Sequence, residues 1–269
     1  MRLLVCTVTR RSPDVCRPNV DFALKTCPDC NFLLVNNGGD PRQFSPERFR
    51  EDPRLSILHL PVNVGYPCGV NFAIQKAFAG DYEFFLVLDD DIMFVNSDWY
   101  AKCVELMAFD RRIGVIGPKV LRPDGQTVLW ANLRMKLGGL VDHFGEPRDK
   151  EEFGRIQRVS SVNGCFFFLR VEHMRKVGYF DLLFSPSGQF VDTDYCFQMW
   201  RHGFSCVYDG RTEIIHRFLA RYSQDDPMRR LHYNVILRVL ELKYAPLAEF
   251  GLKLEDEIDK LGREIVLPV

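Results

Sequence analysis

Apolar, strand-like runs alternate with helix-like segments through roughly residue 120 of this chain, and this alternation limits the folds open to it more than any other feature. Strands are expected at Met1–Val8, Asn31–Asn36, Leu55–Leu60, Phe84–Leu88 and Ile113–Gly117. The spacing of apolar residues predicts helices at Val20–Thr26, Gly69–Phe78 and Trp99–Phe109. Strands that alternate with helices in this way predict βαβ units and a mostly parallel sheet.

The pattern changes after Pro118, but no linker or internal repeat interrupts the chain. The later segments are longer strands at Val128–Leu137 and Arg158–Leu169, a polar stretch at Gly138–Gly154, strand-like "FSCVYDG" and "TEIIHRF", and helices at Met228–Lys243 and Leu247–Leu261. We therefore expect a single α/β domain whose mixed, mostly parallel sheet is flanked by helices.

The predicted strand Phe84–Leu88 runs directly into three acids, Asp89, Asp90 and Asp91. In open α/β sheets, ligands bind beyond the carboxyl ends of the strands. An extended chain would point Asp89 and Asp91 to one side and Asp90 to the other. Two carboxylates about 6 Å apart repel by about 3 kcal/mol at an effective dielectric constant of about 20. Mg²⁺ or Mn²⁺ would remove this cost, although a solvated loop that caps the next helix is an alternative.

Three further segments carry groups that could meet near this acidic end. The stretch "NVGYPCGVNFAI", residues 63–74, follows a strand and opens a helix, and its glycines permit close backbone approach. Asp192 and Asp194 open a later helix, where an acid is either a cap or a general base. His216 follows an apolar strand and either serves the core or completes a metal site. Each segment alone also fits ordinary structure, so only the combination indicates a site.

The charge balance and the lengths of the apolar runs argue against several classes of protein. The formal net charge is −1 at pH 7 and no long basic block occurs, which argues against a nucleic-acid partner. No run approaches the roughly 18 apolar residues that cross a bilayer, and the N-terminus lacks the features of a signal peptide. The nine cysteines are scattered, which suits reduced thiols. We expect a cytoplasmic protein, and leave open a peripheral contact of the C-terminal helices with the inner face of a membrane.

Taken in chain order, these motifs resemble the family 2 glycosyltransferases, whose nucleotide-sugar-binding fold is called GT-A. The resemblance runs from about Leu3 to His216 and is carried by "VCTVTRR", "LLVNNGGD", "NVGYPCGVN", "LVLDDDI", "NGCFFFLR", "VGYFDLLF", "DTDYC" and "IIH". It implies a GT-A domain over residues 1–225, with a nucleotide-binding half at 1–118 and an acceptor-side half at 119–225. Residues 226–269 would then form a C-terminal helical extension packed on or beside this domain.

The resemblance implies donor-binding roles for individual residues. The segment around Thr7 and Thr9 would border the nucleobase, and Asn36 occupies a position where the family often has an acid that recognises the base. An amide can still pair with a pyrimidine edge, but this departure weakens the inference about the donor. The other residues expected at the donor are Asn63, Gly65, Asn71, Asp89 and Asp90.

Metal-binding roles are implied in the same way. Asp89 and Asp91 match the two ends of the family's DxD element, which would hold Mn²⁺ or Mg²⁺. His216 matches a position that in some members adds a ligand or contacts the diphosphate.

The catalytic base and the acceptor side complete the implied site. Asp192 matches the second acid of an "ED" pair that supplies the base, although Val191 replaces the glutamate, and Asp194 is then expected to hold the helix or loop. Asn163 and Gly164 match a segment near the donor sugar and the acceptor.

The implied reaction is a metal-dependent, inverting transfer of a hexose or deoxyhexose from a nucleoside diphosphate sugar, with UDP- or dTDP-sugars favoured. The acceptor would be a saccharide or a lipid-linked hydroxyl in glycan or polysaccharide assembly. Gly138–Gly154 and Ser185–Gln189 are expected to cover the site, because both contain residues typical of mobile loops. One alternative is a nucleotidyltransferase, although the N-terminus has no Gly-rich, Lys-bearing signature. The other is a non-catalytic sugar-nucleotide-binding or scaffold protein, which Val191 and Asn36 would favour.

Overall fold

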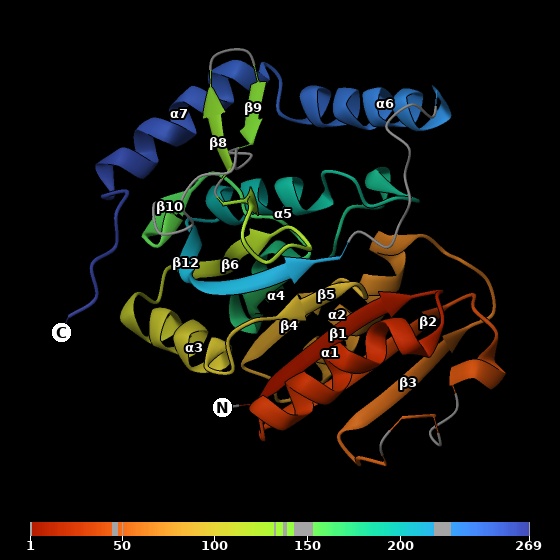
Figure 1. The fold of residues 1–269 in the computed structure, drawn as a ribbon. Coiled ribbons are helices and arrows are strands. Elements are labelled where there is room, and N and C mark those ends of the chain that lie inside the picture. Colours follow the sequence, from red (N-terminus) through yellow and green to blue (C-terminus); the bar gives the residue numbers. More distant parts are fainter. Residues whose placement is uncertain are drawn as a thin grey trace.

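Alternating strands and helices build the first half of the fold, as the sequence predicts (Figure 1). The computed structural model describes residues 2–44, 48–49, 51–131, 133–136, 139–142, 153–217 and 227–268. The elements of the first half are β1 (Leu3–Thr9), α1 (Pro13–Thr26), β2 (Cys30–Asn37), η1 (Pro41–Phe44), β3 (Leu55–Leu60), α2 (Tyr66–Ala79), β4 (Phe84–Leu88), β5 (Ile92–Phe94), α3 (Trp99–Phe109) and β6 (Ile113–Leu121). Helix α1 begins earlier than expected because Ser12 caps it and Pro13 suits its first position.

The second half contains more breaks than the sequence suggests. Its elements are β7 (Val128–Trp130), β8 (Leu133–Lys136), β9 (Gly139–Asp142), β10 (Ile156–Val159), β11 (Phe166–Arg170), α4 (Val171–Val177), η4 (Leu182–Phe184), α5 (Val191–Arg201), β12 (Ser205–His216), α6 (Pro227–Lys243) and α7 (Leu247–Lys260). The single strand expected at Arg158–Leu169 is wrong. Its two ends belong to β10 and β11, which occupy different places in the sheet, and the turn between them carries Asn163 and Gly164.

Two other expected strands also have different lengths. Strand β6 continues through Pro118, which pairs with Asp209 beside a register shift in β12, and a missing N–H is tolerated at such an irregularity. The strand expected at Val128–Leu137 is divided between β7 and β8, and Leu137 lies outside the described residues. Of the expected cover at Gly138–Gly154, residues 138 and 143–152 also lie outside them.

The large sheet is mixed, as predicted. Its strand order is β10-β12-β6-β11-β4-β1-β2-β3, with β5 on β12 and β7 on β6. Strands β1, β2, β3 and β4 pair in parallel, β12 runs parallel to β6, and β11 is antiparallel to both β4 and β6. The carboxyl ends of β1 and β4 therefore open on the same edge of the sheet, where α/β folds place their ligands.

Side chains of the sheet alternate between two hydrophobic cores. In β1, Leu3 and Val5 face the core that includes α1 and α3, whereas Leu4 and Cys6 face the core that includes α2, α4 and α5. This alternation is the two-residue period of a strand that is covered on both faces. All nine cysteines are free, and all except Cys68 are buried.

The two C-terminal helices lie at the opposite end of the molecule from β2 and β3 (Figure 1). They join the larger core, with Leu240 of α6, Tyr244 just after this helix, and Leu254 and Ile258 of α7 almost fully buried. The C-terminal segment thus shares its core with the helices around α5. None of the helices that the structure describes is long and apolar enough to cross a membrane.

Candidate active site

A cavity of about 1030 Å³ opens at the carboxyl ends of β1 and β4. Its walls also include the loop before α5, the first turn of α5, the end of β12 and part of α6. The predicted site residues that line it are Thr9, Asn63, Asp89, Asp90, Asp91, Asn163, Gly164, Asp192 and His216. The structure therefore brings residues from both halves of the chain to one cavity, although they are spread over most of the sequence.

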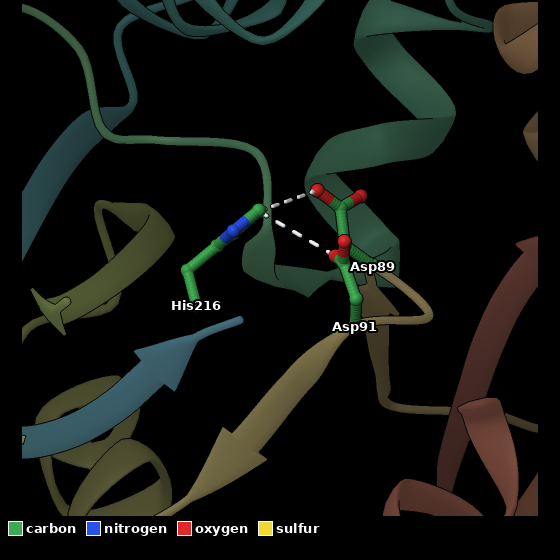
Figure 2. Close-up of side chains that lie close together, drawn as sticks. All are labelled: Asp89, Asp91 and His216. Carbon is green, nitrogen blue, oxygen red and sulfur yellow. Dashed lines mark ion pairs between the residues drawn. The ribbon is translucent and has the colours of Figure 1, made fainter. Parts of the chain in front are cut away.

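Asp89, Asp91 and His216 form a cluster whose ligand atoms all lie within 4.8 Å of one another (Figure 2). The Nε2 atom of His216 is 3.5 Å from Oδ2 of Asp89 and 3.6 Å from Oδ1 of Asp91. Strand pairing sets this arrangement, because His216 at the end of β12 pairs with Ile92, the residue after Asp91. Two carboxylates and one imidazole are a donor set that suits a divalent transition metal ion.

Asp90 points away from this cluster, as the alternation of an extended chain predicts. Its carboxylate accepts hydrogen bonds from Thr9 Oγ1 at 2.5 Å and from Arg11 Nη1 at 3.0 Å. The same Arg11 nitrogen donates to Oδ2 of Asp91 at 2.9 Å, which leaves Oδ1 facing His216. Burial raises the pKa of Asp90 to about 6, although Thr9 and Arg11 oppose the shift. Arg11 thus balances the charge of two acids of the triplet and fixes the orientation of Asp91.

Asp192 lies in the first turn of α5, where the helix dipole favours a negative charge. The Gly164 amide donates to Oδ2 at 2.7 Å, and the Thr193 amide donates to Oδ1 at 2.8 Å. A Cβ atom at Gly164 would lie 2.9 Å from the Cβ of Asp192, so a larger residue would displace this carboxylate. The turn between β10 and β11 therefore positions Asp192 at the cavity.

Asp194 is only two residues away but lies in the core. Its carboxylate is 2.8 Å from Lys243 Nζ and accepts a hydrogen bond of 2.7 Å from the Tyr244 hydroxyl. The same Lys243 donates to Asp181 at 2.6 Å. Burial raises the pKa of Asp194, and the contacts with Lys243 and Tyr244 oppose that shift. Asp194 therefore ties α5 to the end of α6, in keeping with its expected role of holding the helix.

The comparison with protein families is decisive at this point. The model of glycosyl transferase family 2 matches residues 4–178. The chain belongs to this family. A search of curated proteins finds no match.

Two solved structures share the GT-A fold of this chain. The crystal structure of GalNAc-T7 with UDP, GalNAc and Mn²⁺ has a TM-score of 0.65 and 14% identity, over 84% of this chain and 45% of that one. The mannosyltransferase PcManGT from Pyrobaculum calidifontis, in complex with GDP-Man and Mn²⁺, has a TM-score of 0.66 and 14% identity, over 93% of this chain and 68% of that one. This chain thus spans less than half the length of GalNAc-T7, and at this identity the likeness concerns the fold.

Four predicted donor-binding residues do not line the cavity: Thr7, Asn36, Gly65 and Asn71. Thr7 is buried within β1. The Asn36 side chain exchanges two hydrogen bonds with the Gly39 backbone, and Asn71 does the same with Phe180. The Asn36 amide holds a turn together and the Asn71 amide ties α2 to Phe180, so their donor-binding roles stay predictions without a cavity contact to support them.

Gly65 has a different function in the loop before α2. Its φ of 86° lies in the left-handed region, and a Cβ atom there would lie 3.0 Å from the Cα of Pro186. The Tyr66 amide then donates to the Pro186 carbonyl at 2.8 Å. Gly65 therefore allows the loop at 185–190 to reach the donor side of the cavity.

The sequence predicts no role for several residues that line the cavity. They are Arg11, Tyr66, Trp130, Arg230, His232 and Tyr233, among others. Arg11 could have been found, since it lies two residues beyond Thr9 at the carboxyl end of a strand. Trp130 packs edge-on against His216, with ring centroids 5.8 Å apart. The three α6 residues carry no local signal, because only the tertiary fold brings α6 to the cavity.

Proposed function

We propose that the protein transfers a sugar from a nucleoside diphosphate sugar to an acceptor hydroxyl, with inversion at the anomeric carbon. The observation that carries this proposal is that Asp192 lines the same cavity as Asp89, Asp91 and His216. A base and a candidate metal cluster thus border one volume, as a reaction between an acceptor and a donor diphosphate requires. The family membership supports the transfer reaction.

Asp89, Asp91 and His216 would hold Mn²⁺ or Mg²⁺ in this proposal. The fit rests on their mutual distances and on the orientation of Asp91, which Arg11 holds with one oxygen toward His216. Mixed oxygen and nitrogen donors favour Mn²⁺ over Mg²⁺, and both fold neighbours were solved with Mn²⁺. When bound, such an ion supplies Lewis-acid stabilisation of negative charge on the leaving diphosphate.

Asp192 is the proposed general base. It would accept the proton of the acceptor hydroxyl as that oxygen attacks the anomeric carbon, which contributes about 10²–10⁴ in rate. Each carboxylate oxygen accepts an amide hydrogen bond, from Gly164 or from Thr193. The two amides hold the carboxylate still while it accepts the proton. Val191 stands where the family has a glutamate, so this position offers no second acid. Its side chain is buried.

The loop at residues 185–190 is proposed to cover the bound donor. Pro186, Ser187, Gly188 and Gln189 line the cavity, and Pro186 touches the loop before α2 through the Tyr66 amide. Closure there would exclude water, which would otherwise hydrolyse the donor. Hydrogen exchange of the Ser187, Gly188 and Gln189 amides should slow when nucleotide and Mn²⁺ are added. Unchanged exchange would remove the covering role.

The donor nucleotide is the next question for this proposal. The fold neighbours hold UDP and GDP-Man, and the sequence favours a UDP- or dTDP-sugar. Thermal-shift measurements with UDP-, dTDP- and GDP-sugars in Mn²⁺ should show one preferred nucleotide. A donor-consumption assay with the same panel separates the alternatives. Release of the nucleoside diphosphate supports transfer, whereas binding without turnover would support a scaffold and release of pyrophosphate a nucleotidyltransferase.

The proposal includes a cytoplasmic location, a peripheral contact with a membrane, and a saccharide or lipid-linked acceptor. Leu231, Val235 and Leu242 are exposed on α6 and fall at spacings that place them on one face of the helix. Leu182 and Leu183 are exposed on η4, which packs beside α6. The full chain should then float with liposomes that contain anionic lipid, and a variant with Leu231, Val235 and Leu242 changed to serine should not.

A further inference from the structure

Helix α6 contributes one wall of the cavity, beside the proposed base. Arg230, His232 and Tyr233 all line the cavity, although they lie far along the chain from the donor-side residues. Lys243 and Tyr244 fix the other end of the same helix to Asp194, two residues after Asp192. The wall and the base are thus held to each other by buried contacts.

An aromatic pair lies immediately before the base. The rings of Phe190 and Tyr233 have centroids 5.2 Å apart and are tilted by 57°. Phe190 has a φ of 62°, a conformation uncommon for a residue with a side chain, and it leads directly into Val191 and Asp192. Tyr233 is 40% exposed, so part of its ring faces solvent at the cavity. An aromatic face next to a carboxylate suits a ligand with both an apolar face and hydroxyl groups.

Polar groups surround this aromatic pair. Ser187 Oγ and His232 Nε2 lie 2.8 Å apart and are hydrogen-bonded, and both residues line the cavity. The Gln189 amide also donates to Ser187 Oγ at 3.2 Å, and a hydroxyl, with one donor and two acceptor positions, has room for one more partner. A few placed polar groups around an apolar surface are what fixes the orientation of a small ligand.

We propose that Tyr233, Phe190, Ser187 and His232 form the acceptor subsite, and that its ligand is a saccharide ring. The C–H face of the ring would pack on Tyr233, and its hydroxyls would bind Ser187 and His232. One hydroxyl would then face Asp192, which follows Phe190 by two residues. This inference rests on the proposed function, because the saccharide is the acceptor of the transfer reaction.

The test measures saccharide binding separately from nucleotide binding. The full chain, with Mn²⁺ and UDP or GDP, is applied to an array of immobilised oligosaccharides, and the nucleotide-dependent thermal shift is recorded in parallel. Wild-type protein should bind a defined set of saccharides. Tyr233→Ala and Tyr233→Leu should weaken this binding at least tenfold, whereas Tyr233→Trp should retain it, because a flat aromatic face is what the ligand needs. Nucleotide binding should persist in all three variants.

Tyr179→Ala is the matched control. Tyr179 is also exposed and also packs on a phenylalanine, Phe78, with centroids 5.5 Å apart, but it does not line the cavity. This variant should bind saccharides as the wild type does. Equal saccharide binding by wild type and Tyr233→Leu would overturn the subsite, as would a wild-type protein that binds nucleotide and no saccharide. Loss of the nucleotide shift in the wild type would instead overturn the proposed function itself.

Discussion

Two groups of acids border the cavity, and they are held in different ways. In the first group, Asp90 is buried against Arg11 while its neighbours Asp89 and Asp91 face His216. In the second group, Asp194 is buried against Lys243 while Asp192 faces the cavity. Each group thus places at least one acid at the cavity beside an acid that a basic side chain contacts, although Arg11 also contacts Asp91.

The source of the basic side chain is what differs. Arg11 follows β1, and the strands β4, β5 and β12 that carry the first group belong to the same sheet. Lys243 ends α6, a helix that lies outside the sheet and beyond the residues matched by the family model. The candidate metal end of the cavity thus depends on the sheet, whereas the end with the proposed base depends on the C-terminal helix.

The largest expected effect is a loss of transfer rate when Asp192 of the second group is changed. Asp192→Asn keeps the shape of the side chain but removes its basicity, so transfer should fall by about 10²–10⁴. Nucleotide binding in Mn²⁺ should be nearly unchanged, since the first group is intact. Steady-state transfer and thermal shift together check this result. Asp256→Asn, on the exposed face of α7, is the control, and near-normal turnover of Asp192→Asn would remove the residue from the role of base.

The next largest effect is a loss of stability when Asp194, the buried acid of the second group, loses its contact with Lys243. Lys243→Met leaves Asp194 buried without its cation, which should lower the free energy of unfolding by about 2–4 kcal/mol. Breaking a fully buried ion pair costs about 3–5 kcal/mol. The expected loss is somewhat smaller here because the Lys243 side chain is 22% exposed. Urea denaturation measures the change. Lys253→Met is the matched control, since it breaks an exposed pair with Glu249 and should leave the free energy of unfolding nearly unchanged. Equal losses of stability in the two variants would show that the contact between Lys243 and Asp194 stabilises the fold no more than an exposed ion pair does.

The first group offers a comparison within the triplet itself. Asp91→Asn should lower Mn²⁺ affinity at least about 100-fold, because loss of an outer-shell partner alone costs about 10–100-fold. Asp90→Asn should have a much smaller effect, since Asp90 faces Thr9 and Arg11. Electron paramagnetic resonance of free Mn²⁺ measures both affinities without an activity assay. If Asp90→Asn were the more damaging change, the assignment of the triplet would be reversed.

The smallest effect belongs to a residue outside both groups. His173 of α4 is buried and stacks on Phe204, with ring centroids 3.7 Å apart. Burial lowers the pKa of His173 from 6.5 to about 4, and the nearby Arg170 adds to this shift. The unfolded chain therefore binds the proton first as the pH falls. The stability from neutral His173 is present above about pH 6.5 and is lost progressively toward about pH 4.

The measurement compares wild type with His173→Gln, so that other titrating groups cancel. Between about pH 7 and pH 5.5, the free energy of unfolding of wild type should fall by about 1 kcal/mol more than that of the variant. His202→Gln, on the exposed end of α5, should follow the wild type. Parallel pH profiles for wild type and His173→Gln would contradict the expected shift.

The sequence was sufficient where a pattern is local. Each strand from β1 to β4 is a short apolar run that ends in turn residues, and the triplet follows β4 without a break, so its place at the edge of the sheet could be predicted. The fold and the family also followed from the order of the motifs. The alternation of Asp89, Asp90 and Asp91 needed only the geometry of an extended chain.

The rest depends on contacts between distant segments. The pairing of Arg11 with Asp90 spans 79 residues, and that of Tyr244 with Asp194 spans 50. No periodicity encodes such a pair. Asn36 and Asn71 illustrate the same limit, because an amide that binds a ligand and an amide that binds the backbone of its own chain are the same residue type. The strand expected at Arg158–Leu169 failed for a related reason, since a run of strand-forming residues does not reveal where a chain leaves one strand position for another.

The pairing of β12 with β5 makes the candidate metal cluster sensitive to insertions and deletions. His216 faces the acids because its strand is in register with Ile92, and β12 already contains shifts in its pairing with β6. Adding or removing one residue between a shift and His216 would turn the imidazole to the opposite face of the sheet. The number of residues in this strand is therefore constrained as tightly as the identity of its last one, whereas substitutions along it that keep the core apolar need not disturb the cluster.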